Sequence, residues 1–168
     1  KYYGYRLEKT EPATIPDTVN NGEVIKVYYI IDEDNTKDLS YTVEYYKDGK
    51  IVSGDTQTVS TTVQVLQPDT LTVDKTQINT VDKYYGYRLE KTEPATIPDT
   101  VNSGAVIKVY YTKRTDLSYT VYYKEQGTEK ELATAKVVEN QTFGDVVTET
   151  AIDINGYDKV APTSGHVT

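Results

Sequence analysis

Apolar and polar residues alternate in short runs along this chain, which is the pattern of half-buried β-strands. The clearest runs are residues 41–46, 85–89 and 106–111. Asp48-Gly49 and Asn102-Ser-Gly104 follow or precede such runs as turn signals. In the last run the charge of Lys108 marks the solvent face, so its neighbours should point inward. The predicted inward residues are Tyr41, Val43, Tyr45, Tyr85, Tyr87, Leu89, Ile107, Val109 and Tyr111.

Between the clear strand runs, the sequence contains both strand and helix signals. Residues 61–66 alternate like a strand, whereas Asp74 begins a spacing that favours a short helix with Asp74 as its cap. Residues 144–151 favour a turn or two of helix more strongly. Pro94 and Pro98 exclude a central strand between them. Strands that flank one short helix indicate a β-dominated α+β fold of small β-grasp-like modules.

An internal repeat organises the chain. Residues 83–111 repeat residues 1–29 at 27 of 29 positions, and residues 38–43 return as 116–121. We therefore expect 1–31 to be the C-terminal half of a repeat, 38–112 a complete repeat, and 116–168 the N-terminal part of another that lacks its last strand. Repeats on short polar connectors form an array, not a single globule.

Composition narrows the function. The 168 residues carry a net charge of −8 and a sequence pI near 4.7, which disfavours nucleic acid and anionic membranes as partners. No apolar run reaches the length of a membrane span. The absence of Cys excludes disulfides, thiolate metal sites and a cysteine nucleophile.

Catalytic and metal chemistry has weak support in the sequence. The single histidine, His166, has no nucleophile pattern around it, so we predict no enzyme and no cofactor. Asp32 and Asp34 are a weak candidate for Ca²⁺ in a linker, against the simpler interpretation of a solvated acidic linker. An internal Lys–Asn or Lys–Asp isopeptide bond is a further hypothesis that the sequence does not place.

The order Y-x-V-x-Y, a Gly-Tyr pair and then V-I-x-V-Y-Y resembles the MucBP family, the mucin-binding-protein repeats of bacterial surface adhesins. Gly4-Tyr5, Gly86-Tyr87 and Gly156-Tyr157 are the Gly-Tyr pairs of the three repeats. The resemblance implies β-grasp-type repeats of an extracellular protein attached to the wall of a Gram-positive bacterium, and it brings no catalytic residues. The complete repeat departs from the pattern, because 48 positions separate Asp38 from Gly86 and only 40 separate Asp116 from Gly156.

The 17 tyrosines are the remaining chemical signal. One interpretation places most of them in small cores and treats the others as cross-strand pairs that cover the sheet. The other makes the outward rings a platform for sugars, with Arg88 beside Tyr84 to pair with a sialic acid or sulfate. The candidate ligand-binding residues are Tyr84, Arg88, Tyr110, Tyr46 and Tyr122, with Tyr2 and Tyr28 as equivalents of Tyr84 and Tyr110.

Two functions follow. In the first, the repeats of a surface adhesin bind mucin-type glycans or host glycoproteins weakly and multivalently. In the alternative, they are spacers that project an adhesive tip from the cell wall. Residues 1–29 and 117–168 each lack part of a repeat, so we also expect one molecule to complete another head to tail.

Overall fold

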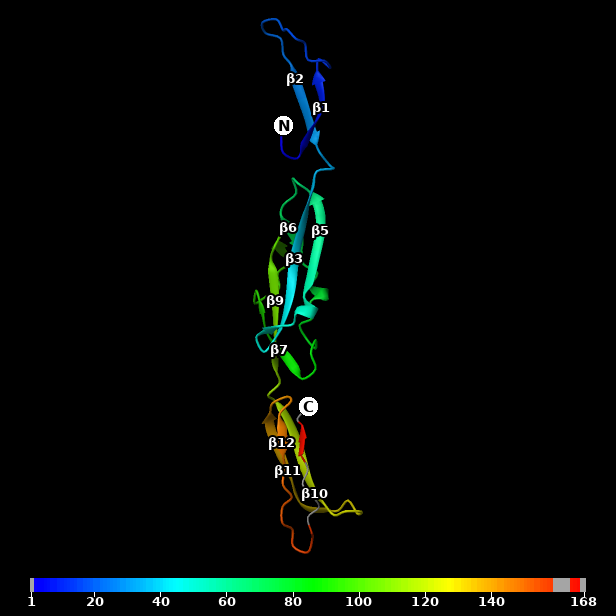
Figure 1. Ribbon diagram of the computed structural model, residues 1–168, viewed down its shortest axis with the longest axis vertical. Coiled ribbons are helices and arrows are strands. Elements are labelled where there is room, and N and C mark those ends of the chain that lie inside the picture. The colour runs from blue at the N-terminus through cyan, green and yellow to red at the C-terminus, as the bar shows by residue number, and fades with distance from the viewer. Residues whose placement is uncertain (1, 159–163, 167–168) are drawn as a thin grey trace. The chain divides into compact units, whose positions relative to one another are not determined.

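The computed structural model describes residues 2–158 and 164–166 (Figure 1). Strands dominate, as predicted, and the helical segments of the described residues are two single turns of 3-10 helix. No helix in this part of the chain is long and apolar enough to cross a membrane. The two turns are η1 (Ser53–Asp55) and η2 (Lys75–Gln77).

The chain divides into two compact units. Unit 1 holds the N-terminal hairpin and unit 2 holds the third repeat, and each also contains part of the middle repeat. One boundary between the units falls between Thr42 and Val43. The units are Lys1–Thr42, Gln57–Val73 and Pro98–Val106 for unit 1, and Val43–Thr56, Asp74–Ile97 and Ile107–Thr168 for unit 2.

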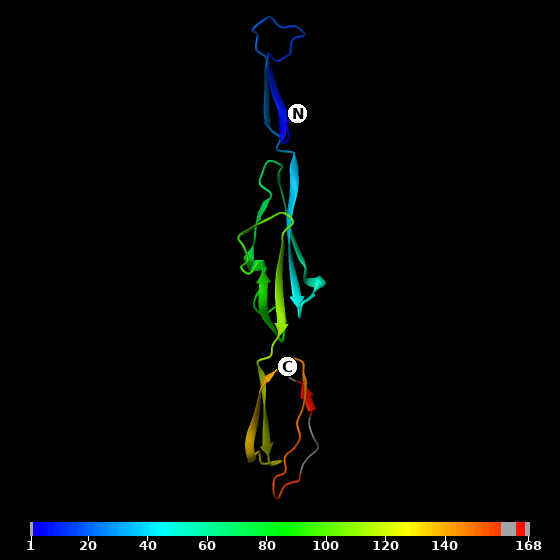
Figure 2. The ribbon, with the colours of Figure 1, turned by 90° about the vertical axis from the view of Figure 1, so that its left-hand side faces the viewer.

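The middle repeat contains a five-stranded sheet in the order β4-β3-β9-β7, with β5 also paired to β3. Figure 2 shows the ribbon of this repeat from a second side. The N–H of Thr42 donates to the carbonyl of Ala105, and the N–H of Asp48 donates to the carbonyl of Tyr111, both at 2.9 Å. Because both residue numbers rise together, β3 and β9 run parallel. The strands are β3 (Thr36–Lys47), β4 (Lys50–Ile51), β5 (Gln57–Gln64), β7 (Tyr87–Glu93) and β9 (Val106–Lys113). A separate ladder pairs β6 (Thr70–Thr72) with β8 (Thr100–Asn102).

The predicted turns are confirmed. Asp48 and Gly49 have φ angles of 46° and 75°, the left-handed pair that a tight hairpin between β3 and β4 requires. Ala105 donates its N–H to the carbonyl of Asn102 at 3.1 Å, which closes the turn into β9. The predicted cap is also present, because Asp74 Oδ1 accepts from the N–H of Thr76 at 3.0 Å at the start of η2.

The cores follow the predicted alternation of β3 and β9. The buried side chains come from one face of each strand, and each buried Val or Ile contributes roughly 1.5–3 kcal/mol to the free energy of folding. The opposite face of both strands carries charged and hydroxyl groups. Buried residues of unit 1 are Leu39, Tyr41, Val65, Leu71 and Val73, and those of unit 2 are Val43, Tyr45, Ile78, Ile107, Val109 and Tyr111.

The inward positions predicted for Tyr85 and Leu89 are wrong. Tyr85 is 79% exposed and Leu89 is 36% exposed, although both were expected inside. The strand β7 begins only at Tyr87, because Gly86 adopts a φ of 77° and turns the chain there. Alternation cannot be extended across such a turn. A register shift in the pairing of β7 with β9, between Leu89 and Lys91, changes the phase again.

The N-terminal hairpin repeats the β7–β9 pair. Its strands are antiparallel, and the register shift falls between Leu7 and Lys9, the positions equivalent to Leu89 and Lys91. The hairpin thus has the local fold that its sequence has in the middle repeat. Its strands are β1 (Tyr5–Glu11) and β2 (Lys26–Ile31).

The third repeat contains two short ladders, and the helix expected at 144–151 is wrong. Val146-Val147-Thr148 forms a strand instead, since three consecutive β-branched residues favour extended backbone. The side chain of His166 lies outside the described residues. The ladders pair β10 (Leu117–Lys124) with β11 (Glu131–Gln141) and β12 (Val146–Thr148) with β13 (Ser164–His166).

Candidate functional site

The outward tyrosines Tyr46 and Tyr110 stack on each other. Tyr46 lies at the end of β3 and Tyr110 on β9, and their ring centroids are 4.7 Å apart with an interplanar angle of 24°. On the β7 side, Lys91 Nζ lies 4.7 Å from the centroid of the Tyr110 ring. Because β9 lies between β3 and β7, one face of Tyr110 is covered by Tyr46 and the other by the Lys91 ammonium. Both faces of this ring are therefore occupied.

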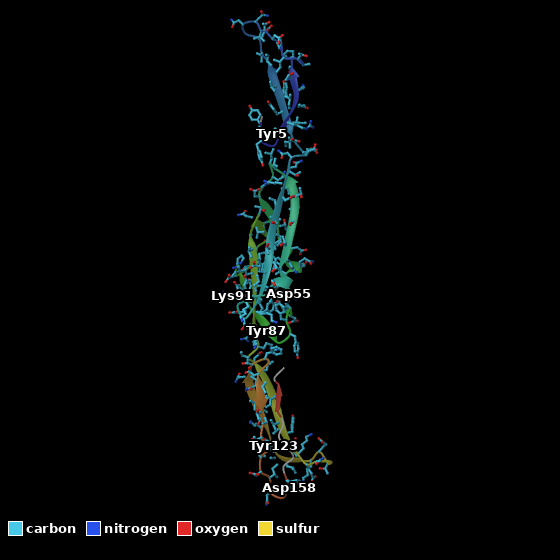
Figure 3. All side chains as sticks on the ribbon, in the orientation of Figure 1. Tyr5, Asp55, Tyr87, Lys91, Tyr123 and Asp158 are labelled. Carbon is cyan, nitrogen blue, oxygen red and sulfur yellow. The ribbon has the colours of Figure 1, made fainter. Side chains whose placement is uncertain are left out.

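The hydroxyls of the stacked pair are also engaged. Tyr110 donates to Glu93 Oε2 at 3.1 Å, and Tyr46 donates to Glu44 Oε2 at 2.6 Å. The hydrogen bond to Glu44 is the main cause that raises the pKa of Tyr46 to about 12. The charged Lys91 Nζ lies 2.7 Å from Glu93 and lowers the pKa of that carboxyl. These groups form one network on the exposed face of the sheet, where Figure 3 labels Lys91.

The N-terminal hairpin contains the same network without the stacked partner. Lys9 Nζ lies 2.9 Å from Glu11 Oε1 and 4.8 Å from the centroid of the Tyr28 ring. Tyr28 donates to Glu11 Oε2 at 3.1 Å, the distance that joins Tyr110 to Glu93. Repetition of these contacts shows that the network is a property of the repeated sequence.

Tyr84, expected outside, is half-buried. Its hydroxyl donates to Asp55 Oδ2, and its ring meets that of Tyr111 edge to face with centroids 5.2 Å apart. Burial is the first cause that raises the pKa of Tyr84, followed by the hydrogen bond to Asp55. Lys83 Nζ lies 3.7 Å from the same carboxylate. Tyr84 therefore packs against the core of unit 2, where Figure 3 labels Asp55.

Arg88 is exposed on β7, and its charge acts on Asp116. The pKa of Asp116 is lowered mainly by its hydrogen bond from Arg114, and the charge of Arg88 lowers it further. Arg114 Nε lies 3.0 Å from Asp116 Oδ1. The charge of Arg88 thus acts on the Arg114–Asp116 pair after β9, whereas Tyr84, the ring expected beside it on the exposed face, packs against Tyr111.

Tyr122 is 58% exposed, whereas Tyr46, Tyr84 and Tyr110 are half-buried. It lies on β10 beside an open cavity of about 470 Å³ in the third repeat. Lys124 Nζ lies 5.7 Å from its ring centroid. Figure 3 labels two other residues of the cavity lining, Tyr123 and Asp158.

Asp32 and Asp34, the weak Ca²⁺ candidates, belong to the connector after β2. They line an open cleft of about 560 Å³ together with Tyr2, Tyr3 and Tyr5. Within 2–158 and 164–166, no three His, Cys, Asp or Glu side chains gather as metal ligands. The N–H of Asp32 donates to the carbonyl of Gly4 at 2.9 Å, so this residue helps to fix the connector.

Sequence reasoning missed a joint between consecutive repeats, which unit 2 contains in full. Gly86 turns the chain before β7, and the ring of Phe143, from the turn after β11, covers it so closely that an added Cβ would lie 2.3 Å from Phe143 Cδ2. Arg114 connects the two sides: its N–H donates to Gly86 at 3.0 Å, and its carbonyl accepts from the N–H of Phe143 at 2.8 Å. The Tyr85 and Tyr87 rings meet Phe143 edge to face, with centroids 5.6 Å and 6.0 Å away.

Unit 1 contains the same joint with different side chains. Leu66 covers Gly4, where an added Cβ would lie 2.6 Å from Leu66 Cγ. The connector here is longer, and its two hydrogen bonds are made by different residues: Asp32 donates to Gly4 at 2.9 Å, and Asn35 accepts from the N–H of Val65 at 3.0 Å. The signal in the sequence was the recurrence of Gly-Tyr pairs, and the only Phe of the chain.

No protein-family model, no curated protein and no solved structure matches this chain.

Proposed function

We propose that this chain is a spacer segment from the extracellular, cell-wall-attached region of a Gram-positive surface adhesin, built from β-grasp-like repeats of the MucBP type. The observation that carries the proposal is the joint that occurs twice. A close contact on the glycine of the Gly-Tyr pair and two backbone hydrogen bonds form in both units. Ordered joints are what a spacer needs, because they fix the direction in which the next repeat continues.

The fold gives the family proposal partial support. The first and last long strands of the middle repeat, β3 and β9, lie side by side and parallel, with antiparallel strands outside them. This arrangement is the one expected of a β-grasp-like module. In the described residues between β6 and β7 a single 3-10 turn takes the position at which we expected the helix.

The occupied tyrosines favour a spacer over a binding module. A sugar needs a ring with a free face, yet Tyr110 is covered on both sides and Tyr84 packs against Tyr111. Their hydroxyls already donate to Glu93 and Asp55. Binding at these rings would require the loss of contacts that stabilise the repeat.

Weak binding of mucin-type glycans is the second candidate, and Tyr122 is the observation that favours it. Its ring is largely exposed, and it lies beside an open cavity lined by Tyr123, Leu132 and Tyr157. Aromatic rings next to polar groups are suited to the apolar face of a sugar. Repetition would multiply a weak affinity.

Binding of the intact chain to purified mucin and to a glycan array tests both candidates. The spacer proposal predicts no saturable binding at millimolar sugar. Saturable binding that is lost in Tyr122→Ala and kept in Tyr110→Phe would overturn it and establish the second candidate. Tyr84→Ala is unsuitable as a probe, because it would also remove a packing contact of the core.

A further inference from the structure

The N-terminal hairpin exposes an apolar face that is fully buried in the middle repeat. Val27 is 45% exposed and Tyr29 is 37% exposed, whereas their equivalents Val109 and Tyr111 are both 0% exposed. The sequences of the two hairpins are nearly identical, so the difference comes from what covers them. In the middle repeat the cover includes β3, the neighbour of β9 in the sheet.

The exposed face is already in the conformation of a completed repeat. The Tyr2 and Tyr29 rings meet edge to face at 4.9 Å and 87°. The equivalent Tyr84 and Tyr111 rings meet at 5.2 Å and 86°. A strand that docked on β2 would therefore meet a surface that needs little rearrangement, which lowers the entropic cost of association.

The third repeat exposes the complementary surface. Tyr119, Val121 and Tyr123 on β10 are only half-buried, whereas Tyr41, Val43 and Tyr45, their equivalents on β3, are at most 2% exposed. Among the described residues, β10 is paired with β11 alone. The open cavity beside Tyr123 is lined by Leu132, Ile154 and Tyr157, which are groups that an apolar strand would cover.

We propose that strand β2 of one molecule adds to strand β10 of a second copy of this chain, in the position that β9 has beside β3. The middle repeat is the template, because residues 116–121 are identical to 38–43 and residues 83–111 nearly identical to 1–29. Its bond from Thr42 to Ala105 then predicts an N–H bond from Thr120 of one copy to the Glu23 carbonyl of the other. Backbone bonds of this kind add a strand to an open edge.

The interface joins two different surfaces, so each molecule keeps one free β2 and one free β10 after pairing. Association therefore continues head to tail and depends on concentration. This inference does not rest on the spacer function, since it concerns surfaces other than the joints.

Sedimentation velocity of the intact chain from micromolar to millimolar concentration is the test. We expect the mean mass to rise by about twofold or more across this range. Val27→Asp and Val121→Asp should each abolish the rise, because each places a charge in the apolar interface. The matched controls Tyr28→Asp and Thr120→Asp put the same charge on the opposite faces of β2 and β10 and should retain most of the rise.

Mixing the two variants separates a lost interface from a lost fold. Val27→Asp keeps an intact β10 and Val121→Asp keeps an intact β2, so their mixture should form a 1:1 dimer and nothing larger. A wild-type chain that stays monomeric across the range would overturn the proposal. So would association that both variants retain, or a mixture of the two variants that stays monomeric.

A chain in which a copy of residues 36–82 precedes Lys1 provides a second readout. Its hairpin face is completed within the same molecule, so its association should be lost. If this longer chain associates as strongly as the original, β2 is not the surface involved and the proposal fails.

Discussion

At the level of single residues, core and surface tyrosines differ in the partners of their hydroxyl groups. In the core, the Tyr111 hydroxyl donates to the Asn79 carbonyl at 2.9 Å, and the Tyr45 hydroxyl accepts from the Asn79 N–H at 3.0 Å. On the outer face, Tyr110 and Tyr46 reach carboxylates instead. A chain with 17 Tyr and one Phe thus uses the same residue as core filler and as surface polar group.

Replacement of Tyr111 by Phe should cost about 1 kcal/mol of unfolding free energy, because it leaves the Asn79 carbonyl without that donor and keeps the ring. Tyr110→Phe, whose hydroxyl lies on an exposed face, should cost no more than about 0.5 kcal/mol. Urea unfolding of the two variants provides the comparison. Equal losses would show that the Asn79 bond is no stronger than a surface bond.

The raised tyrosine pKa values predict a loss of stability in base. The pKa of Tyr111 is raised to about 12, mainly by burial, above its value of about 10 in an unfolded chain. The folded state therefore holds the proton more tightly. The contribution of this raised Tyr111 pKa to the free energy of unfolding is complete below about pH 10 and is lost as the pH rises from about 10 through about 12. The unfolding free energy, followed from pH 8 to 12, should fall in this window. Tyr111→Phe should make the slope of unfolding free energy against pH smaller, by the equivalent of about one proton released on unfolding. A flat profile up to pH 12 in the wild type would contradict this assignment.

At the element scale, β3 and β9 could be predicted from sequence and the segment before β7 could not. In residues 41–46 and 106–111 apolar and polar positions alternate without interruption, and the side chains predicted to point inward are the buried ones. Before β7, the positive φ of Gly86 interrupts the alternation of inward and outward side chains. Tyr84, expected outside, is half-buried, and Tyr85, expected inside, is exposed. The strand at Val146 was missed because its partner is β13, a pairing between distant segments that local pattern does not contain.

The joint at Gly86 has a matched control in the same repeat. Gly86 and Gly104 both have positive φ angles, 77° and 87°, but an added Cβ would strike Phe143 at the first and meet open space at the second. Alanine should cost roughly 1–2 kcal/mol at either position through backbone strain. At Gly86 we expect a further loss of about 1–3 kcal/mol from the overlap with the ring.

Unfolding free energies of Gly86→Ala and Gly104→Ala, each with and without Phe143→Ala, measure this difference. Removal of the ring should relieve much of the extra loss at Gly86 and leave the loss at Gly104 unchanged. If Phe143→Ala has the same effect on both glycine variants, the ring does not cover Gly86.

At the scale of the whole molecule, the repeat boundaries at 38–112 and 116–168 stay a prediction from recurrence in the sequence, and recurrence alone could not predict how one repeat contacts the next. Composition and internal repeats are properties of the sequence and need no knowledge of contacts between distant residues. A joint depends on which side chain covers Gly4 or Gly86, and Leu66 and Phe143 lie about 60 residues away in the chain. The longer connector at Asp32 was interpreted as a solvated linker or an ion site, whereas its backbone repeats the bonds of Arg114.

The spacer proposal requires ordered joints, and a distance measured across one of them shows whether the joint is ordered. The chain has no Cys, so Glu90→Cys and Val137→Cys would carry the only two spin labels. Both sites are exposed and lie in unit 2, on either side of the joint at Gly86. We predict a single narrow distance distribution, which Phe143→Ala broadens. A distribution that is already broad in the otherwise unchanged chain, and that Phe143→Ala leaves the same, would show that the joint at Gly86 is not ordered.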